Sequence, residues 1–232
     1  MLHINNVTVN LAGVNVLRNI HAELQAGTAV AVVGHNGAGK TTLLRSIMGL
    51  LTTREGEILL DGNDLLTQPA HSRAGLGIGY APEERVIFPT MSVLENLRLP
   101  CEVSRLSDTE IQQRLDMVLD TVPQLESMLN RSGSALSGGQ GKMVALGRAL
   151  MIGTRLVLLD EPFQGLAPVL ALQYADALGR LRRARPDLCI VITESNASLL
   201  QGIPDLTLIL ERGSLESRHE IAHDSLSHPK PA

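Results

Sequence analysis

Three short segments carry residue types that bind and hydrolyse nucleoside triphosphates. The first, residues 34–41, reads Gly-His-Asn-Gly-Ala-Gly-Lys-Thr and fits the pattern G-x-x-x-x-G-K-[ST]. Its glycines let the backbone wrap closely round a phosphate, so that successive N–H groups point at the anion. Lys40 can bridge the terminal phosphates, and the Thr41 hydroxyl can ligate Mg²⁺.

The elements on either side of this loop decide whether it is a phosphate site or a chance glycine-rich turn. The apolar run 29–33 predicts a strand before it, and residues 40–50 show the spacing of a helix after it. This setting places a helix N-terminus at the phosphate. We therefore predict that the nucleotide is bound by Gly34, His35, Asn36, Gly37, Ala38, Gly39, Lys40, Thr41 and Thr42. His35 holds a variable position of the pattern and is expected at the surface.

The second segment, residues 156–162, reads Leu-Val-Leu-Leu-Asp-Glu-Pro and predicts a buried strand that ends in two carboxylates. Side chains alternate across a strand, so the two acids cannot face a metal in the same way. Such sites commonly use one acid for Mg²⁺ and its neighbour for the attacking water. We assign Asp160 to the metal and Glu161 to the general base. An acidic turn facing solvent is the plain alternative.

The third segment consists of Leu136, Ser137, Gly138, Gly139 and Gln140. Ser137 can cap the helix that follows, and glycines at a helix start again form an anion-binding end. One chain seldom needs two phosphate cradles for a single ATP. We therefore expect this segment, the signature, to close over the ATP of a partner subunit.

The hydrophobic pattern predicts the fold that positions these segments. Continuous apolar runs indicate strands buried on both faces, as in a parallel sheet covered by helices; they occupy residues 29–33, 78–81, 156–159, 189–193 and 206–210. Residues 56–60 predict a further strand. Residues 2–9 alternate better and are expected in a second, antiparallel sheet. The predicted class is α/β, a P-loop NTPase core with a mostly parallel sheet.

The middle of the chain is predicted to be helical. Residues 107–110 form a capping box followed by apolar residues at helical spacing, and Pro168 opens another helix. We expect a single domain over residues 1–232. Its core comprises residues 1–85 and 154–222, a helical subdomain is inserted at about 86–153, and the polar tail 223–232 is expected to be flexible.

The composition restricts the partners. The 232 residues carry a formal net charge of −4, which gives no reason to expect nucleic acid. Cys101 and Cys189 are too few for a disulfide framework. The N-terminus shows no signal-peptide pattern, and no run of about 18 apolar residues occurs. A role at a membrane must then come through another subunit.

The phosphate loop, the signature and the acidic strand, in this order, make the chain similar to the ATP-binding cassette (ABC) family over nearly its whole length. The resemblance implies an ATPase that uses ATP and Mg²⁺ and forms a dimer with two ATPs between its subunits. Each site would then combine the Lys40 region of one subunit with the Ser137 region of the other.

Further segments resemble one subgroup, the smaller LivF-type ATPase subunits of branched-chain amino acid importers: residues 77–83, 87–89, 93–97, 165–168 and 193–196. This resemblance implies a cytoplasmic subunit peripheral on the inner face of the cell membrane. Its partners would be transmembrane permease subunits, a second ATPase subunit and, indirectly, a periplasmic or extracellular solute-binding protein. A hetero-pair is favoured, and pairing with a second copy stays open.

Three positions depart from the general cassette pattern. Leu11 stands where an aromatic ring usually stacks on adenine, so weaker affinity and relaxed base selectivity are expected. Glu83 replaces the usual glutamine, and its carboxylate can still ligate the metal or position water. Ser195 falls at the switch position, where histidine contacts the terminal phosphate. Serine cannot carry a positive charge, so this chain's own site is expected to turn over slowly.

Other functions stay open at this stage. One alternative is a degenerate cassette, in which ATP serves mainly to hold the dimer together and hydrolysis matters little. Leu11 and Ser195 favour this alternative, whereas the intact Asp160–Glu161 pair opposes it. A non-transport ABC protein would normally carry two cassettes or a long coiled-coil insertion. A small-molecule kinase could share the phosphate loop, but that function would not explain residues 136–140. The transported substrate is not encoded in these motifs.

Overall fold

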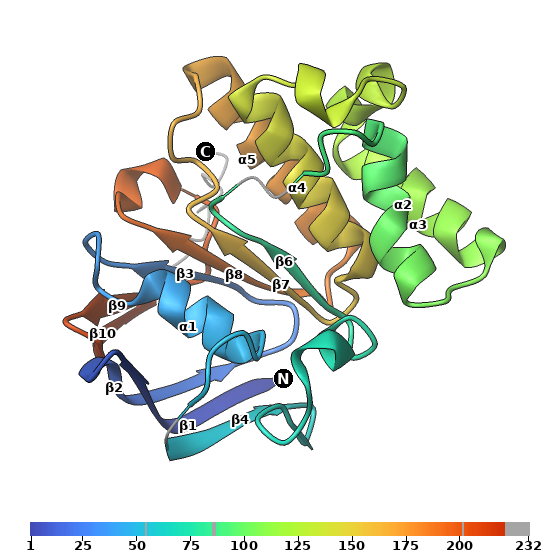
Figure 1. The fold of residues 1–232 in the computed structure, drawn as a ribbon. Helices are drawn as coiled ribbons and strands as arrows, with labels where there is room; N and C mark the ends of the chain where they lie inside the picture. The colour runs from blue at the N-terminus through green and yellow to red at the C-terminus, as the bar shows by residue number, and fades with distance from the viewer. Residues whose placement is uncertain (54, 85–86, 201, 221–232) are drawn as a thin grey trace, which may run out of the picture.

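A six-stranded sheet, mostly parallel, forms the centre of the molecule (Figure 1). The computed structural model describes residues 1–53, 55–84, 87–200 and 202–220. The sheet has the order β10-β9-β3-β8-β7-β6. Its strands are β3 (Ala29–Val33), β6 (Ile78–Ala81), β7 (Leu156–Asp160), β8 (Cys189–Glu194), β9 (Leu206–Glu211) and β10 (Ser214–Glu220). All neighbours pair in parallel except β9 and β10. This confirms the predicted mostly parallel sheet, to which β10 adds an antiparallel strand that the sequence did not predict.

The second sheet is antiparallel and has the order β2-β1-β4-β5, as predicted from the alternation near the N-terminus. It consists of β1 (Leu2–Leu11), β2 (Val14–Leu24), β4 (Glu55–Leu60) and β5 (Asn63–Asp64). Strand β2 was not predicted, because its register shifts and Asn19 adopts a positive φ of 46° that interrupts the alternation. A tight turn at Ala12 and Gly13, both with positive φ, joins β1 to β2.

Helix α1 (Lys40–Ile47) lies between the two sheets (Figure 1) and shares a hydrophobic core with both. The prediction of a helix to residue 50 was wrong at its end. Gly49 adopts a φ of +69°, and a Cβ there would lie 2.7 Å from the Arg73 guanidinium. The chain therefore leaves the helix where only glycine fits.

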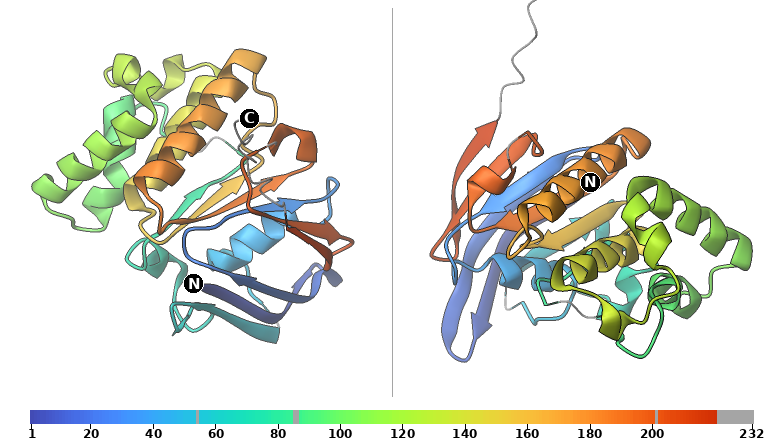
Figure 2. Two further views of the ribbon diagram at one scale, coloured as in Figure 1. Left: turned by 180° about the vertical axis from the view of Figure 1, so that it is seen from behind. Right: turned by 90° about the horizontal axis from the view of Figure 1, so that it is seen from above.

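The other face of the central sheet is covered by α4 (Gly138–Ile152) and α5 (Pro168–Ala184), around a second hydrophobic core. Helices α2 (Val93–Val103) and α3 (Asp108–Thr121) extend beside them, as Figure 2 shows. Short 3₁₀ turns occupy Ala70–Arg73, Pro123–Met128, Gly133–Ala135 and Ala197–Leu200. The capping box at Ser107 and Glu110 starts α3, as predicted.

Helix α4 packs both on β6 and on α2 and α3, so it joins the central sheet to the helical segment. We therefore propose that the inserted subdomain consists of α2, α3 and the turns after them, with α4 shared. The predicted boundary at residues 85 and 86 and the tail 223–232 lie outside the described residues. In the described ranges, no helix has the length and apolar character needed to span a bilayer.

Candidate functional site

The phosphate loop links the end of β3 to the start of α1, as the sequence predicted. Gly37 and Gly39 have φ of +83° and +112°, a backbone conformation that residues with a Cβ rarely adopt. A Cβ on Gly39 would also lie 2.8 Å from the side chain of Leu17. The glycines therefore allow a turn that leads directly into the helix N-terminus, where backbone N–H groups attract anions.

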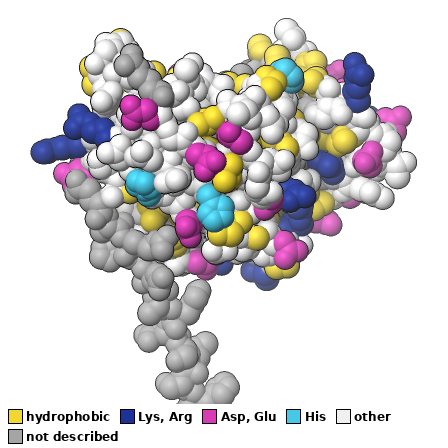
Figure 3. Space-filling model, turned by 90° about the horizontal axis from the view of Figure 1, so that it is seen from below, with side chains coloured by type: hydrophobic (Ala, Val, Ile, Leu, Met, Phe, Trp, Pro, Cys, Tyr) yellow, Lys and Arg dark blue, Asp and Glu magenta, His cyan; other side chains and the backbone are white. Residues whose placement is uncertain are grey.

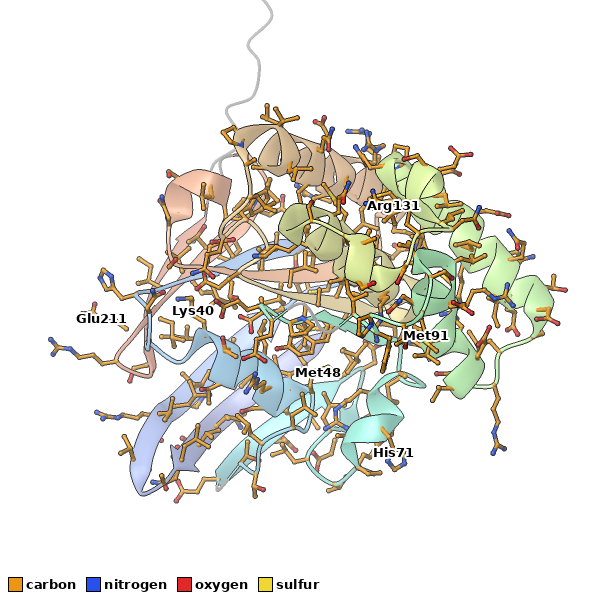
Figure 4. The ribbon with its side chains drawn as sticks, turned by 45° about the horizontal axis from the view of Figure 1, so that its top comes forward. Lys40, Met48, His71, Met91, Arg131 and Glu211 are labelled. Atoms are coloured by element: carbon orange, nitrogen blue, oxygen red, sulfur yellow. The ribbon has the colours of Figure 1, made fainter. Side chains whose placement is uncertain are left out.

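Lys40 is nearly buried and lies over this loop. Its Nζ donates to the carbonyl oxygens of Gly34, at 2.5 Å, and His35, at 3.1 Å. It also forms an ion pair with Oε1 of Glu161 at 2.9 Å, with both side chains 5% exposed. The ammonium group is thus held where the loop backbone and the acidic strand meet (Figure 4).

Asp160 is held by three hydroxyl groups at the end of β7. Its Oδ1 accepts from Thr41 Oγ1 at 3.1 Å and from Thr193 Oγ1 at 2.7 Å, and its Oδ2 accepts from Tyr80 at 3.2 Å. Burial, together with the Asp160 carboxylate, raises the pKa of Tyr80 above its usual range, so Tyr80 stays a donor. Three neutral donors leave the charge of Asp160 free to attract a cation.

Glu161 contacts a different set of groups from Asp160, because it follows the end of β7 and its backbone leaves the extended conformation there. Its Oε2 accepts from the Ser195 hydroxyl at 3.1 Å and from the Ser195 N–H at 3.3 Å. Its backbone has a positive φ of 46°, and its N–H donates to the Thr193 carbonyl oxygen at 3.1 Å. The carboxylate therefore sits between Lys40 and Ser195 with only 4% of the residue exposed.

A cavity of about 260 Å³ opens over these groups. Its lining consists of Val16, Asn36, Gly37, Gly39, Lys40, Thr41, Thr42, Glu83, Glu161 and Gln164. Most of the predicted nucleotide residues, the candidate base and Glu83 thus share one hollow. Val16 and Gln164 were not predicted, because they carry no motif of their own and reach the site only through the fold. Thr193, also not predicted, lies in β8, which runs parallel to β7, and pairs there with Asp160.

The signature starts α4, and no residue of 136–140 lines this cavity. The Ser137 hydroxyl accepts from the Gln140 N–H at 3.3 Å, and the Gln140 side chain accepts from the Ser137 N–H at 3.0 Å. Ser137 and Gly138 are exposed. In Figure 4, Arg131, which contacts Gln140, lies far across the molecule from Lys40. Within one chain, the phosphate loop and the signature therefore do not line a common cavity.

The donor set fits Mg²⁺ held together with a triphosphate. The described residues contain no group of three or more His, Cys, Asp or Glu side chains that could bind a metal by themselves. Mg²⁺ typically uses one or two protein oxygens and completes its shell with phosphate and water. Thr41 Oγ1 and the Asp160 carboxylate, 3.1 Å apart, provide such a pair, with Glu83 at the same cavity.

A strand, a glycine-rich loop, a helix and an adjoining acidic strand define a P-loop nucleoside triphosphatase. Residues 17–164 match the family model described as ABC transporter. The chain belongs to the ABC transporter family, as an ATP-binding subunit whose class hydrolyses ATP.

The chain is similar to several transport ATP-binding proteins. It is 34% identical to the probable branched-chain amino acid transport protein LivF of Archaeoglobus fulgidus, over 93% of this chain and 90% of that one. It is 32% identical to BraG, a high-affinity branched-chain amino acid transport protein of Pseudomonas aeruginosa, over 99% and 97%. It is also 35% identical to LptB, a lipopolysaccharide export protein of Acidithiobacillus ferridurans, over 91% and 88%.

Solved structures of cassettes share the fold. A structure of an ATP-binding subunit of an ABC transporter is 27% identical and covers 95% of this chain and 90% of that one, with a TM-score of 0.83. The dimeric bacterial cassette MJ0796 has a TM-score of 0.83 at 24% identity, covering 95% and 98%. The predicted fold class is therefore confirmed.

Glu194 is a buried carboxyl group beside the site that the sequence did not predict as a site residue. It is 0% exposed, its Oε1 accepts from the Phe163 N–H at 2.8 Å, and its Oε2 has no partner in the described part of the chain. Burial raises its pKa to about 7; the Phe163 N–H and Lys142 oppose that shift, whereas the Glu161 carboxylate adds to it.

This raised pKa predicts how stability depends on pH. The folded state holds the Glu194 proton more tightly than the unfolded state, so the free energy of unfolding falls as pH rises from about 4.5 to about 7. Glu194→Gln keeps the shape but cannot ionise. We expect it to be more stable than the wild type by about 1–3 kcal/mol at pH 8, and by much less at pH 4.5. Urea unfolding at both pH values measures this, and an equal difference at both would contradict it.

Leu11 ends β1 and is 37% exposed, close in sequence to Val16 at the cavity. If an adenine ring lies there, Leu11→Tyr should strengthen ATP binding, because stacking of a base on an aromatic ring contributes about 1–3 kcal/mol. Calorimetry with ATP and GTP measures affinity and base selectivity. Val103→Tyr, at an exposed position on α2, is the matched control. Unchanged affinity in the Leu11 variant, or sharp discrimination against GTP by the wild type, would refute the stacking role.

Proposed function

We propose that this chain is the ATP-hydrolysing subunit of an importer for branched-chain amino acids or related small polar solutes. The observation that carries the ATPase part is the junction of Lys40, Thr41, Asp160 and Glu161 at the cavity beside the phosphate loop. The similarity to LivF and BraG supports the choice of cargo.

Each residue at the site has a distinct task in this proposal. The loop N–H groups and Lys40 bind the phosphates of ATP, and Thr41 and Asp160 hold Mg²⁺, with Glu83 as a further ligand or water-positioning group. Bound Mg²⁺ supplies positive charge for the phosphate oxygens. Glu161 accepts a proton from the attacking water, and its two bonds from Ser195 orient the carboxylate.

A second cassette subunit is needed to complete the site. No residue of the signature, 136–140, lines this chain's own cavity, and Ser137 is exposed, which supports a role toward another chain. The similar cassette MJ0796 is dimeric. We favour a hetero-pair with a different ATPase subunit, as the LivF-type resemblance implies, and a pair of identical chains is the other outcome.

The membrane partner would bind in a groove of about 520 Å³ between α1, the 3₁₀ turn at Ala70–Arg73, α2 and α4. Met48 and His71 line it and are labelled in Figure 4. Pro82 and Glu84 also line it, so a permease helix seated there would contact the segment next to Glu83. We place the protein in the cytoplasm, on the inner face of the membrane, with the solute-binding protein reached only through the permease.

The charges of the surface agree with protein partners rather than nucleic acid. On the face that Figure 3 shows, Asp and Glu side chains are interspersed with hydrophobic and basic ones, without a continuous basic cluster. The formal net charge of −4 has the same sign as a phosphate backbone.

Transport reconstituted with the membrane subunits tests the cargo. The genes beside this one identify two permeases, a second ATPase and a solute-binding protein, if the proposal is right. Proteoliposomes with these subunits should then accumulate leucine or valine in an ATP-dependent way. The similarity to LptB makes lipid export the second candidate. Release of a lipopolysaccharide, with no uptake of amino acid, would favour export over import.

The switch position gives a prediction about rate. Ser195 is a neutral donor bonded to Glu161, whereas a protonated histidine adds charge at the terminal phosphate. Ser195→His is therefore expected to increase the ATPase rate roughly tenfold, by about 1.4 kcal/mol of barrier. Phosphate release is measured for both proteins, alone and with the partner cassette. No gain in either setting would show that serine causes no catalytic deficit.

A further inference from the structure

Lys142 links the signature helix to the candidate general base. It lies in α4, separated from the signature by Gly141, and its Nζ donates to the backbone carbonyl oxygen of Glu161 at 2.6 Å. This bond connects two parts of the chain that act at different ATP sites in the proposed dimer. α4 would serve the partner's ATP, whereas Glu161 would serve the ATP of its own chain.

The backbone at Glu161 has a conformation that depends on such contacts. Its φ of 46° is disfavoured for residues with a side chain. The surrounding bonds hold it: the Glu161 N–H donates to Thr193, and the Phe163 N–H donates to Glu194 at 2.8 Å. On the other side of the Glu161 Cα, Lys142 holds the carbonyl oxygen of the next peptide. The direction of the Glu161 carboxylate therefore depends on β8 and on α4 together.

We propose that Lys142 is a positioning residue, which ties the position of Glu161 to that of α4 and thereby links the two ATP sites of a dimer. The inference rests on the proposed paired assembly. When the N-terminus of α4 docks on a partner's ATP, its second turn moves with it, and the ammonium group moves the Glu161 carbonyl. The base is then aligned only when the neighbouring site is filled.

The test compares Lys142→Met, which removes the donor at similar length, with Lys142→Arg, which retains it. ATPase kinetics are measured on the full chain in the assembly, identical or mixed, in which the wild type is active. We expect Lys142→Met to lower kcat at least tenfold with little change in KM, because small misplacements of a catalytic group have large effects. Its Hill coefficient for ATP should fall toward 1, and Lys142→Arg should restore both values.

A double variant tests whether Lys142 acts through Glu161. In the Glu161→Gln background, Lys142→Met should cause no further loss of the residual rate, because the base it positions is already gone. Arg183→Met, a basic residue exposed in the last turn of α5, controls for the loss of one charge.

The outcomes separate this inference from the proposed function. A wild type that hydrolyses ATP cooperatively, with kcat and Hill coefficient unchanged in Lys142→Met, would overturn the inference and leave the ATPase proposal intact. An additive loss in the Glu161→Gln background would also overturn it, since it would indicate a general effect on folding. A wild type that binds no ATP in any assembly would overturn both.

Discussion

Glu161→Gln is expected to stop ATP turnover while ATP still binds, and to trap an ATP-bound dimer that the wild type resolves. Glutamine has the same shape but cannot accept the proton of the attacking water. Removal of a general base typically lowers the rate by about 10²–10⁴-fold. Phosphate release gives the rate, and size-exclusion chromatography with light scattering, with and without ATP, gives the dimer.

The control is Glu126→Gln, which changes an exposed carboxylate in the turn after α3. It should hydrolyse ATP at the wild-type rate. If Glu161→Gln also retained that rate, Glu161 would not be the base. If it bound ATP but formed no dimer in any pairing, the assignment of residues 136–140 to a partner's nucleotide would lose its support.

Lys40→Met is expected to weaken both nucleotide binding and the folded state. Lys40 supplies the positive charge at the loop, and charge-assisted hydrogen bonds contribute about 1.5–3 kcal/mol each. ATP affinity should therefore fall by roughly 10–150-fold, measured by calorimetry. The variant also leaves the Glu161 carboxylate, 4% exposed, without its cation. Breaking a buried ion pair by removing one partner typically costs about 3–5 kcal/mol of stability.

The double variant Lys40→Met/Glu161→Gln separates these two effects. It removes the unpaired charge, so the free energy of unfolding without nucleotide should recover toward that of the wild type, as measured in urea. ATP affinity should stay low, because the phosphates still lack their cation. If the free energy of unfolding and the ATP affinity both recovered, Lys40 would act only on Glu161 and not on the nucleotide.

Local patterns predicted the parts of the molecule that short segments determine. The runs 29–33 and 78–81 became strands with those limits, because continuous apolar residues can be buried on both faces only inside a covered sheet. The capping boxes at Ser107 and Ser137 start helices, since their bonds span only a few residues.

Longer-range features were not predictable in this way. Strand β2 was missed because a bulge breaks its alternation, and the helix after the phosphate loop ended early at a glycine packed against Arg73. Val16, Gln164, Thr193 and Glu194 reach the site from three separate parts of the chain. Val16 and Gln164 stand in no motif, and segment 193–196 indicated only the LivF-type subgroup, so spatial proximity alone marks these residues as part of the site.

By itself, the sequence predicted the chemistry: a phosphate loop, an acidic strand and a second helix start suited to anions, all from residue type and short spacing. The tertiary structure alone decided which of these groups meet. It brought Glu161 between Lys40 and Ser195, joined Lys142 to the Glu161 backbone and kept the signature away from the cavity. The reason is physical: hydrogen bonds and ion pairs depend on distances of a few ångströms between segments that lie far apart along the chain, and packing of the whole core sets those distances.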